Sequence, residues 1–227
     1  MISPKILKKG DRIGIVATAR KISIEEIQPA VDILKSWGLE IVLGENLFRE
    51  QNQFSGSDAE RTNDLQNMLD DNFIKAIFCA RGGYGTVRII DKIDFTKFIK
   101  TPKWIIGFSD VTVLHSHIHN LGIETIHAPM LLNFTKNLNA VETLRKAVLG
   151  EKLLYEIPNH SLNRKGNAEG ILVGGNLSLL YALTGSESDI DAKGKILFIE
   201  DLDEYLYHID RMMLNLKRSG KLKSLAG

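Results

Sequence analysis

The chain has 227 residues, a length that permits one large domain or two small ones around a buried core. Hydrophobic residues make up 44% and charged residues 25%, as in an ordinary soluble globular protein. Lys and Arg number 29 against 28 Asp and Glu, so the net charge of +1 argues against binding to nucleic acid or to an anionic membrane. No window approaches the ~18 apolar residues of a membrane span, and residues 1–10 have no apolar stretch of signal-peptide length. We therefore expect a cytoplasmic protein.

Strands and helices are expected to alternate over the first two-thirds of the chain. Short apolar runs predict strands at 12–17, 40–43, 75–80 and 104–107, with a further candidate at 124–127. Helices are predicted to begin at two capping boxes, Ser23 with Glu26 and Ser57 with Glu60, and helical periodicity marks 87–93, 111–121 and 141–149. This alternation predicts βαβ units in a parallel sheet, with functional loops at the carboxyl ends of the strands.

A change of composition near residue 157 predicts a second unit. Residues 157–169 are polar, contain Pro158 and are interpreted as a linker between an N-terminal domain (1–156) and a smaller C-terminal domain (170–227). The second unit is expected to contain a strand at 195–199. A helix at 205–216 should then place four apolar residues on one face: Ile209, Met212, Met213 and Leu216.

The turn Gly107-Phe108-Ser109-Asp110 lies between a predicted strand and a predicted helix. A serine at such a turn can present its hydroxyl above the sheet edge, next to backbone N–H groups that stabilise an oxyanion. Ser and Asp are also favoured helix caps, so the tetrapeptide alone is compatible with either role. It lacks the second glycine of the Gly-x-Ser-x-Gly elbow.

Two further segments could carry chemistry. Arg81-Gly82-Gly83-Tyr84-Gly85 follows a predicted strand and suits either a backbone nest for an anion or a tight structural turn. It matches neither Gly-x-Gly-x-x-Gly nor a P-loop, which argues against a nucleotide site. Glu200-Asp201 ends a predicted strand, where an acid can orient a histidine or simply cap the edge.

The lone cysteine and the histidines give weaker signals. Cys79 lies in an apolar run and is expected to be a small core residue. His115 and His119 can share a helix face, but two imidazoles without a third ligand make a poor metal site. His127, at the end of a candidate strand, could line a cleft or be a satisfied structural histidine.

Taken in order, the segments are more specific than any one of them. The order is Lys9–Ala17 (KGDRIGIVA), Ala80–Gly85 (ARGGYG), Ile106–Asp110 (IGFSD), Gly174–Leu177 (GGNL), Leu197–Asp201 (LFIED) and Tyr207–Met212 (YHIDRM). This combination resembles the LD-carboxypeptidase family, the muramoyltetrapeptide carboxypeptidases, which also includes the microcin C immunity peptidases. The resemblance spans nearly the whole chain. It implies a Rossmann- or flavodoxin-like N-terminal domain, a smaller C-terminal α/β domain and a homodimer.

The resemblance also implies a serine peptidase with a Ser–Glu–His triad that removes a C-terminal D-amino acid, such as D-Ala from a murein tetrapeptide. Ser109 matches the nucleophile and Glu200 the acid of the triad, while the backbone N–H groups of Gly83 and Asp110 match the oxyanion hole. No metal or organic cofactor is expected. Four side chains are candidates for contact with the substrate: Arg81, Tyr84, Asn176 and His127.

The chain departs from the family pattern at the catalytic histidine, which in the family lies several tens of residues beyond the Glu-Asp pair. The only histidine after Glu200 is His208, which does not match that motif. We therefore expect an incomplete C-terminal domain, a chain truncated before its catalytic histidine, and low or no activity. A smaller departure is Ala128 in His127-Ala128-Pro129, where relatives are expected to have glycine.

Three alternatives to the murein peptidase stay open. An immunity-type peptidase would act on a peptide–nucleotide conjugate with the same chemistry. A non-catalytic module would hold a small anionic ligand on loop 81–86 and would keep its role after Ser109→Ala. A nucleotide-dependent enzyme has the least support, because the phosphate-binding motifs are missing.

Overall fold

The computed structural model describes residues 1–227 and contains two parallel sheets. The larger has the order β2-β1-β3-β4-β5 and is built from β1 (Arg12–Val16), β2 (Glu40–Leu43), β3 (Ile74–Cys79), β4 (Trp104–Gly107) and β5 (Ile126–His127). The smaller pairs β6 (Leu172–Asn176) with β7 (Ile196–Glu200). The predicted α/β fold is confirmed, and the strand order of the larger sheet is that of flavodoxin-like proteins.

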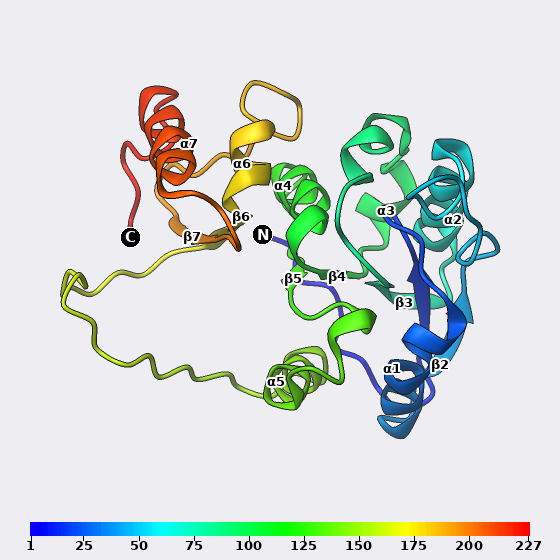
Figure 1. The fold of residues 1–227 in the computed structure, drawn as a ribbon. Coiled ribbons are helices and arrows are strands. Elements are labelled where there is room, and N and C mark those ends of the chain that lie inside the picture. The colour runs from blue at the N-terminus through cyan, green and yellow to red at the C-terminus, as the bar shows by residue number, and fades with distance from the viewer.

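Helices cover both faces of the larger sheet (Figure 1). On one face α1 (Ile24–Ser36) and α5 (Leu138–Val148) pack against side chains such as Ile15 and Ile106. On the other, α2 (Asp58–Asp70), α3 (Thr96–Lys100) and α4 (Thr112–Asn120) pack against side chains such as Ile77 and Ile105. Successive residues of one strand thus point into the cores on opposite faces of the sheet. Because both faces are buried, the strands are continuous apolar runs rather than alternating apolar and polar residues. Cys79 is fully buried in the second core, as predicted.

The helix starts predicted from capping boxes are confirmed, whereas the predicted helix at 87–93 is wrong. Both capping boxes are present, at Ser23 and at Ser57. Residues 87–93 instead form two 3₁₀ turns, η1 (Thr86–Arg88) and η2 (Ile90–Lys92). The backbone N–H of Thr86 donates to the carboxylate of Asp110 (2.9 Å), a contact from another element that local periodicity does not reveal. The sequence reading also missed the short α3.

The second unit, which begins at β6, packs against α4. Helix α6 (Leu177–Ala182) follows β6, and α7 (Leu206–Arg218) follows β7. The backbone N–H of Asn176 donates to Thr112 Oγ1 at the start of α4 (3.1 Å), and Figure 1 shows β6 and α6 beside that helix. Two of the four predicted apolar residues of α7, Met212 and Leu216, are fully buried, with Ile209 and Met213 packed against them.

Residues 151–171, between α5 and β6, are exposed and form neither helix nor strand; Figure 1 shows them as a wide loop. No helix of the structure has the length and apolar character needed to cross a membrane.

Candidate active site

Ser109 occupies a strained turn directly after β4. It opens the 3₁₀ turn η3 (Ser109–Val111) and has a φ of +59°, one of four positive values among the non-glycine residues. An L-residue adopts this left-handed conformation at a cost, and such strain gathers at functional sites. Neither Ser109 nor Asp110 makes a side-chain hydrogen bond to the N–H groups of the following helix. The helix-cap alternative is therefore wrong, and the turn has the strand–turn–helix form of a nucleophile elbow.

Asp110 ties this turn to the Gly-rich loop, residues 81–86. Its buried carboxylate accepts hydrogen bonds from the backbone N–H of Thr86 (2.9 Å) and from Thr86 Oγ1 (2.6 Å). Thr86 Oγ1 also lies 2.8 Å from Thr18 Oγ1 in the loop after β1. Loops after three neighbouring strands thus meet at one buried carboxylate, at the carboxyl edge of the sheet.

The Gly-rich loop presents an unused backbone donor next to this turn. Gly83 has a φ of +109°, a conformation that favours glycine, and its N–H makes no hydrogen bond within the chain. Gly82 lies beside Asp110, since a Cβ at Gly82 would be in ordinary van der Waals contact with the Asp110 Cβ (3.6 Å). The structure therefore brings together Ser109, Asp110 and Gly83, and we call these residues with the rest of loop 81–86 the serine corner.

Arg61 supports the serine corner through buried hydrogen bonds to the backbone, a role that was not predicted from the sequence. Its guanidinium is fully buried, forms an ion pair with Asp58 and donates from Nη1 to the carbonyls of Thr18 (2.5 Å) and Gly85 (3.0 Å). The available signal was its position four residues before Leu65, on the buried stripe of α2. An arginine on an apolar helix face indicates a buried polar partner.

Glu200 and His127 lie side by side on a second corner of the site. Glu200 ends β7, where it pairs in register with Asn176 of β6, and its Oε1 lies 3.8 Å from His127 Nε2. His127 ends β5 and pairs in register with Gly107, two residues before Ser109. We call Glu200, His127 and the adjacent Asp201 the glutamate corner.

The polar groups of the glutamate corner are not all satisfied. Glu200 Oε1 and His127 Nδ1 are both buried without a hydrogen-bond partner. Burial raises the pKa of Glu200, and the neighbouring Asp201 raises it further. Burial lowers the pKa of His127, so its imidazole is neutral at pH 7. A cavity of about 810 Å³ adjoins this corner and is lined by His127, Val173 and Phe198 among others, but not by Ser109.

Asp201 organises the start of α6. Its carboxylate accepts hydrogen bonds from Ser178 N (2.9 Å), Ser178 Oγ (2.8 Å) and Asn176 Nδ2 (3.0 Å). Burial on its own would raise the pKa of Asp201, but the hydrogen bonds from Leu202 and Ser178 outweigh burial and lower it. Asn176 thus donates from Nδ2 to Asp201, and its Oδ1 accepts from Leu179 N (3.2 Å). With both ends of its side chain bonded, Asn176 holds Asp201 in place next to Glu200, with which it pairs across the sheet.

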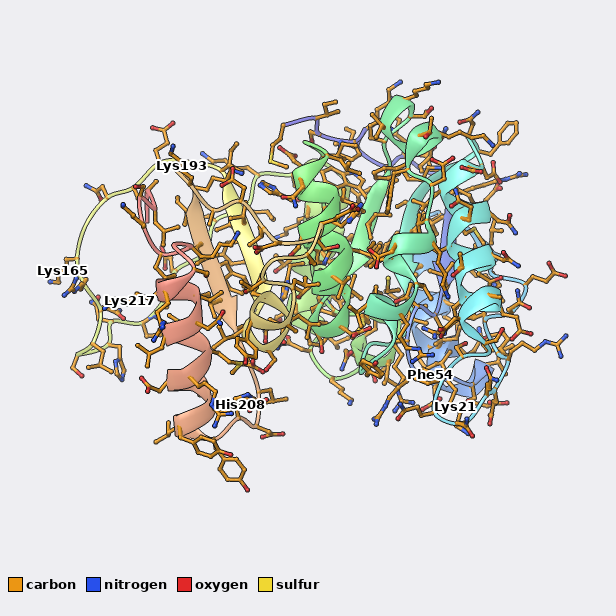
Figure 2. All side chains as sticks on the ribbon, turned by 90° about the horizontal axis from the view of Figure 1, so that it is seen from above. Lys21, Phe54, Lys165, Lys193, His208 and Lys217 are labelled. Atoms are coloured by element: carbon orange, nitrogen blue, oxygen red, sulfur yellow. The ribbon has the colours of Figure 1, made fainter.

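Arg81 and Tyr84, the other two predicted substrate contacts, make their contacts away from Ser109. Arg81 donates to the carbonyl of Lys21 (3.1 Å) and lies 3.6 Å from Glu26. Tyr84 is half-exposed, with its ring 6.0 Å from that of Phe54. Figure 2 shows Phe54 and Lys21 on the half of the molecule opposite to His208.

The six histidines form no triad with Ser109, because none is hydrogen-bonded to it. His115 contacts Thr125 Oγ1 (2.8 Å) and donates from Nε2 to the carbonyl of Gly107 (2.9 Å); burial lowers its pKa to about 4. His119 lies 2.7 Å from Lys195 Nζ, and His208 bonds to Glu204 (2.5 Å). No group of three or more His, Cys, Asp or Glu side chains could hold a metal ion.

Family models and relatives match this arrangement over nearly the whole chain. Residues 13–128 match the LD-carboxypeptidase N-terminal domain, and residues 169–227 match the LD-carboxypeptidase C-terminal domain. The chain is 42% identical to the probable murein peptide carboxypeptidase of Bacillus subtilis, over 99% of this chain and 72% of that protein. It is 30% identical to the murein tetrapeptide carboxypeptidase of Pseudomonas aeruginosa, over 92% of this chain and 72% of that protein.

Solved structures agree with the sequence matches. An MccF-like protein from Bacillus anthracis superposes with a TM-score of 0.90 at 25% identity, over 99% of this chain and 78% of that one. The muramoyltetrapeptide carboxypeptidase from Oxalobacter formigenes gives 0.83 at 28% identity, over 94% of this chain and 74% of that one. The chain belongs to the LD-carboxypeptidase family, and the resemblance seen in the sequence is confirmed.

Proposed function

We propose that the protein is a serine carboxypeptidase that cleaves an L,D peptide bond and releases D-Ala from murein tetrapeptides during cell-wall recycling. The observation that carries this proposal is the strained Ser109 turn, bound through Asp110 to a Gly-rich loop with an unused N–H at Gly83. The 42% identity to a probable murein peptide carboxypeptidase supports the substrate class.

In the proposed mechanism Ser109 Oγ attacks the scissile carbonyl and forms a tetrahedral oxyanion. The N–H groups of Gly83 and Asp110 stabilise the negative charge on that oxygen as it develops. A histidine takes the proton from the serine and donates it to the nitrogen of the leaving D-Ala. The C–N bond then breaks and an acyl-enzyme remains. Water then attacks the acyl-enzyme carbonyl while the histidine takes its proton; the ester C–O bond breaks, the proton passes to Ser109 Oγ, and the shortened peptide leaves with a new carboxylate. Glu200 orients that histidine and stabilises its protonated form.

We propose that the histidine of this mechanism is not among residues 1–227. His115, His117, His119 and His208 are held by other partners, and His160 is exposed on the loop between α5 and β6. His127 contacts Glu200 rather than Ser109. Because Glu200 Oε1 has no hydrogen-bond partner, it is available to bind an incoming imidazole N–H. Residues 1–227 alone are therefore expected to hydrolyse the peptide poorly, by substrate binding and the oxyanion hole.

The experiment compares residues 1–227 with the whole gene product in an assay of D-Ala release from L-Ala-γ-D-Glu-L-Lys-D-Ala or its diaminopimelate analogue. We expect efficient release by the whole product that is lost in Ser109→Ala, and weak release by residues 1–227. No release by a folded whole product would refute the murein proposal. Efficient release by residues 1–227 would show that one of their own histidines, such as His127 or His208, is the base.

A second candidate is supported by the match to the MccF-like protein, whose TM-score is 0.90. Under this alternative the same residues cleave a peptide–nucleotide conjugate, as an immunity-type peptidase does. An aminoacyl–nucleotide conjugate added to the D-Ala assay separates the two, because each candidate predicts turnover of only one substrate. Tight binding of either compound without turnover, unaffected by Ser109→Ala, would instead support a non-catalytic binding module.

We also propose that the protein forms a homodimer. Four large apolar side chains gather on the surface at the start of α7, namely Leu202, Tyr205, Leu206 and Tyr207. Large apolar side chains exposed close together in the chain are a common feature of surfaces that contact another protein. The mass measured by light scattering should be that of two chains, and a glutamate at Leu206 should lower it to one.

A further inference from the structure

Arg20 lies over the oxyanion loop. It follows β1, its backbone N–H bonds to the carbonyl of Gly82 (3.4 Å), and it forms an antiparallel bridge with Phe54. Its side chain crosses Gly83 so closely that a Cβ there would lie 2.6 Å from Arg20 Cδ and 3.2 Å from Nε. Glycine at position 83 therefore permits both the positive φ and the approach of this arginine.

The guanidinium of Arg20 has no partner in the chain, unlike its basic neighbours. Arg61 and Arg88 pair with Asp58, Lys21 pairs with Glu50, and Arg81 lies near Glu26. Arg20 forms neither an ion pair nor a side-chain hydrogen bond, and its side chain is exposed. An unpaired guanidinium thus lies beside the unused N–H of Gly83.

The position of Arg20 in the fold is one where ligands bind. In a sheet of order 2-1-3-4-5 the connections leave β1 and β3 in opposite directions, and the crevice between their carboxyl ends is the usual binding site. Arg20 stands after β1 and Gly83 after β3, on the two sides of that crevice. Asp110, bonded to the loop after β3, connects the same crevice to Ser109.

We propose that Arg20 binds the C-terminal carboxylate of the residue that the enzyme releases, and so restricts cleavage to the chain end. This inference rests on the proposed carboxypeptidase function. In a peptide bound for that reaction, only the leaving nitrogen and one Cα separate the terminal carboxylate from the carbonyl whose oxygen enters the oxyanion hole. A cation beside Gly83 is therefore next to that carboxylate. A guanidinium matches a carboxylate with two parallel hydrogen bonds, which a neutral amide cannot accept in the same way.

The test measures binding rather than turnover, in the Ser109→Ala form of the whole gene product. Calorimetry gives the Kd of L-Ala-γ-D-Glu-L-Lys-D-Ala and of the same peptide with a C-terminal carboxamide. With Arg20 present, the free acid should bind about 10- to 100-fold more tightly than the amide, as expected for a charge-assisted hydrogen bond. In Arg20→Met this preference should fall to about 1, and Arg20→Lys should be intermediate because it keeps the charge but not the fork.

Lys21→Met is the matched control, because it removes one exposed positive charge from the adjacent position and should keep the preference for the free acid. An unchanged preference in Arg20→Met, or an equal loss of affinity for acid and amide, overturns the role of Arg20 and leaves the peptidase proposal standing. No binding of either peptide by the folded Ser109→Ala form with Arg20 intact contradicts the peptidase proposal itself and the role of Arg20 with it.

Discussion

The serine corner and the glutamate corner differ in whether all of their buried side-chain polar atoms are hydrogen-bonded. At the serine corner the buried carboxylate of Asp110 accepts two hydrogen bonds from Thr86 and holds the Ser109 turn against the Gly-rich loop. At the glutamate corner Glu200 Oε1 and His127 Nδ1 are buried without partners, beside a cavity of about 810 Å³. Buried polar groups are almost always hydrogen-bonded, so exceptions call for an explanation. The buried side-chain polar atoms of the serine corner find their partners within residues 1–227, whereas the glutamate corner has capacity for a further polar partner.

The largest expected effect follows from the loss of the Ser109 hydroxyl, the nucleophile of the proposed mechanism. In the whole gene product, Ser109→Gly should lower kcat for D-Ala release by about 10⁴-fold or more, as for other serine nucleophiles. The same change should raise the free energy of unfolding by about 1 kcal/mol, because glycine adopts a positive φ without the steric cost that serine bears at +59°. Urea denaturation measures the second effect.

Ser109→Ala is the control for this pair of effects, since it removes the hydroxyl but keeps a Cβ in the left-handed conformation. It should be as inactive as the glycine variant without the gain in stability. A Ser109→Gly protein that is less stable than the wild type would show that the hydroxyl makes a stabilising contact that outweighs the strain.

A pair of matched carboxylate deletions sharpens the comparison between the corners. Asp110→Ala leaves the buried N–H of Thr86 without a partner and should cost about 2 to 4 kcal/mol of stability. Asp201→Ala removes a less buried carboxylate whose donors at Ser178 can turn to water, and should cost about 1 kcal/mol. Equal losses in thermal or urea unfolding would contradict the view that the serine corner is the more tightly constrained of the two.

The sequence predicted the fold well because the signals that define it are local. Capping boxes at Ser23 and Ser57 and the apolar runs of the strands depend on residues close together in the chain. The error at 87–93 arose because the N–H of Thr86 bonds to Asp110, which is 24 residues away. Helical periodicity contains no information about such a contact.

The candidate site was predictable only in part, for a similar reason. The order of the motifs pointed to Ser109 and Glu200. The Gly107–Asp110 tetrapeptide alone did not decide whether its serine is a helix cap or a candidate nucleophile. The φ of Ser109 and the commitment of Asp110 to Thr86 decided against the cap. The approach of His127 to Glu200 depends on how the two sheets dock, and no spacing within either sheet predicts it.

The pH dependence of stability should differ when Glu200 is changed. Its pKa is raised in the folded state, so the ionised form is disfavoured by folding. The contribution of Glu200 to the free energy of unfolding is therefore most favourable below the unfolded pKa of about 4.3, where the side chain is protonated. It is lost as the pH rises through the folded pKa. Glu200→Gln, which cannot ionise, should therefore be more stable than the wild type at pH 7.5 and equally stable at pH 3.5. Urea unfolding at both values checks this, and a difference that is the same at both would refute it.

The smallest expected effect concerns His208, the histidine nearest in sequence to Glu200. Its ring is bonded to Glu204, which lies four residues earlier and just before the start of α7, in a partly buried pair that we expect to contribute about 1 kcal/mol or less. His208→Ala should lower stability by no more than that and change D-Ala release by less than about 2-fold, within the range of surface substitutions. His127→Ala is the informative contrast, because it removes the side chain next to Glu200 while leaving α7 intact. If His208→Ala abolished activity and His127→Ala did not, the base would belong to α7, and Glu204 rather than Glu200 would be the acid that orients it.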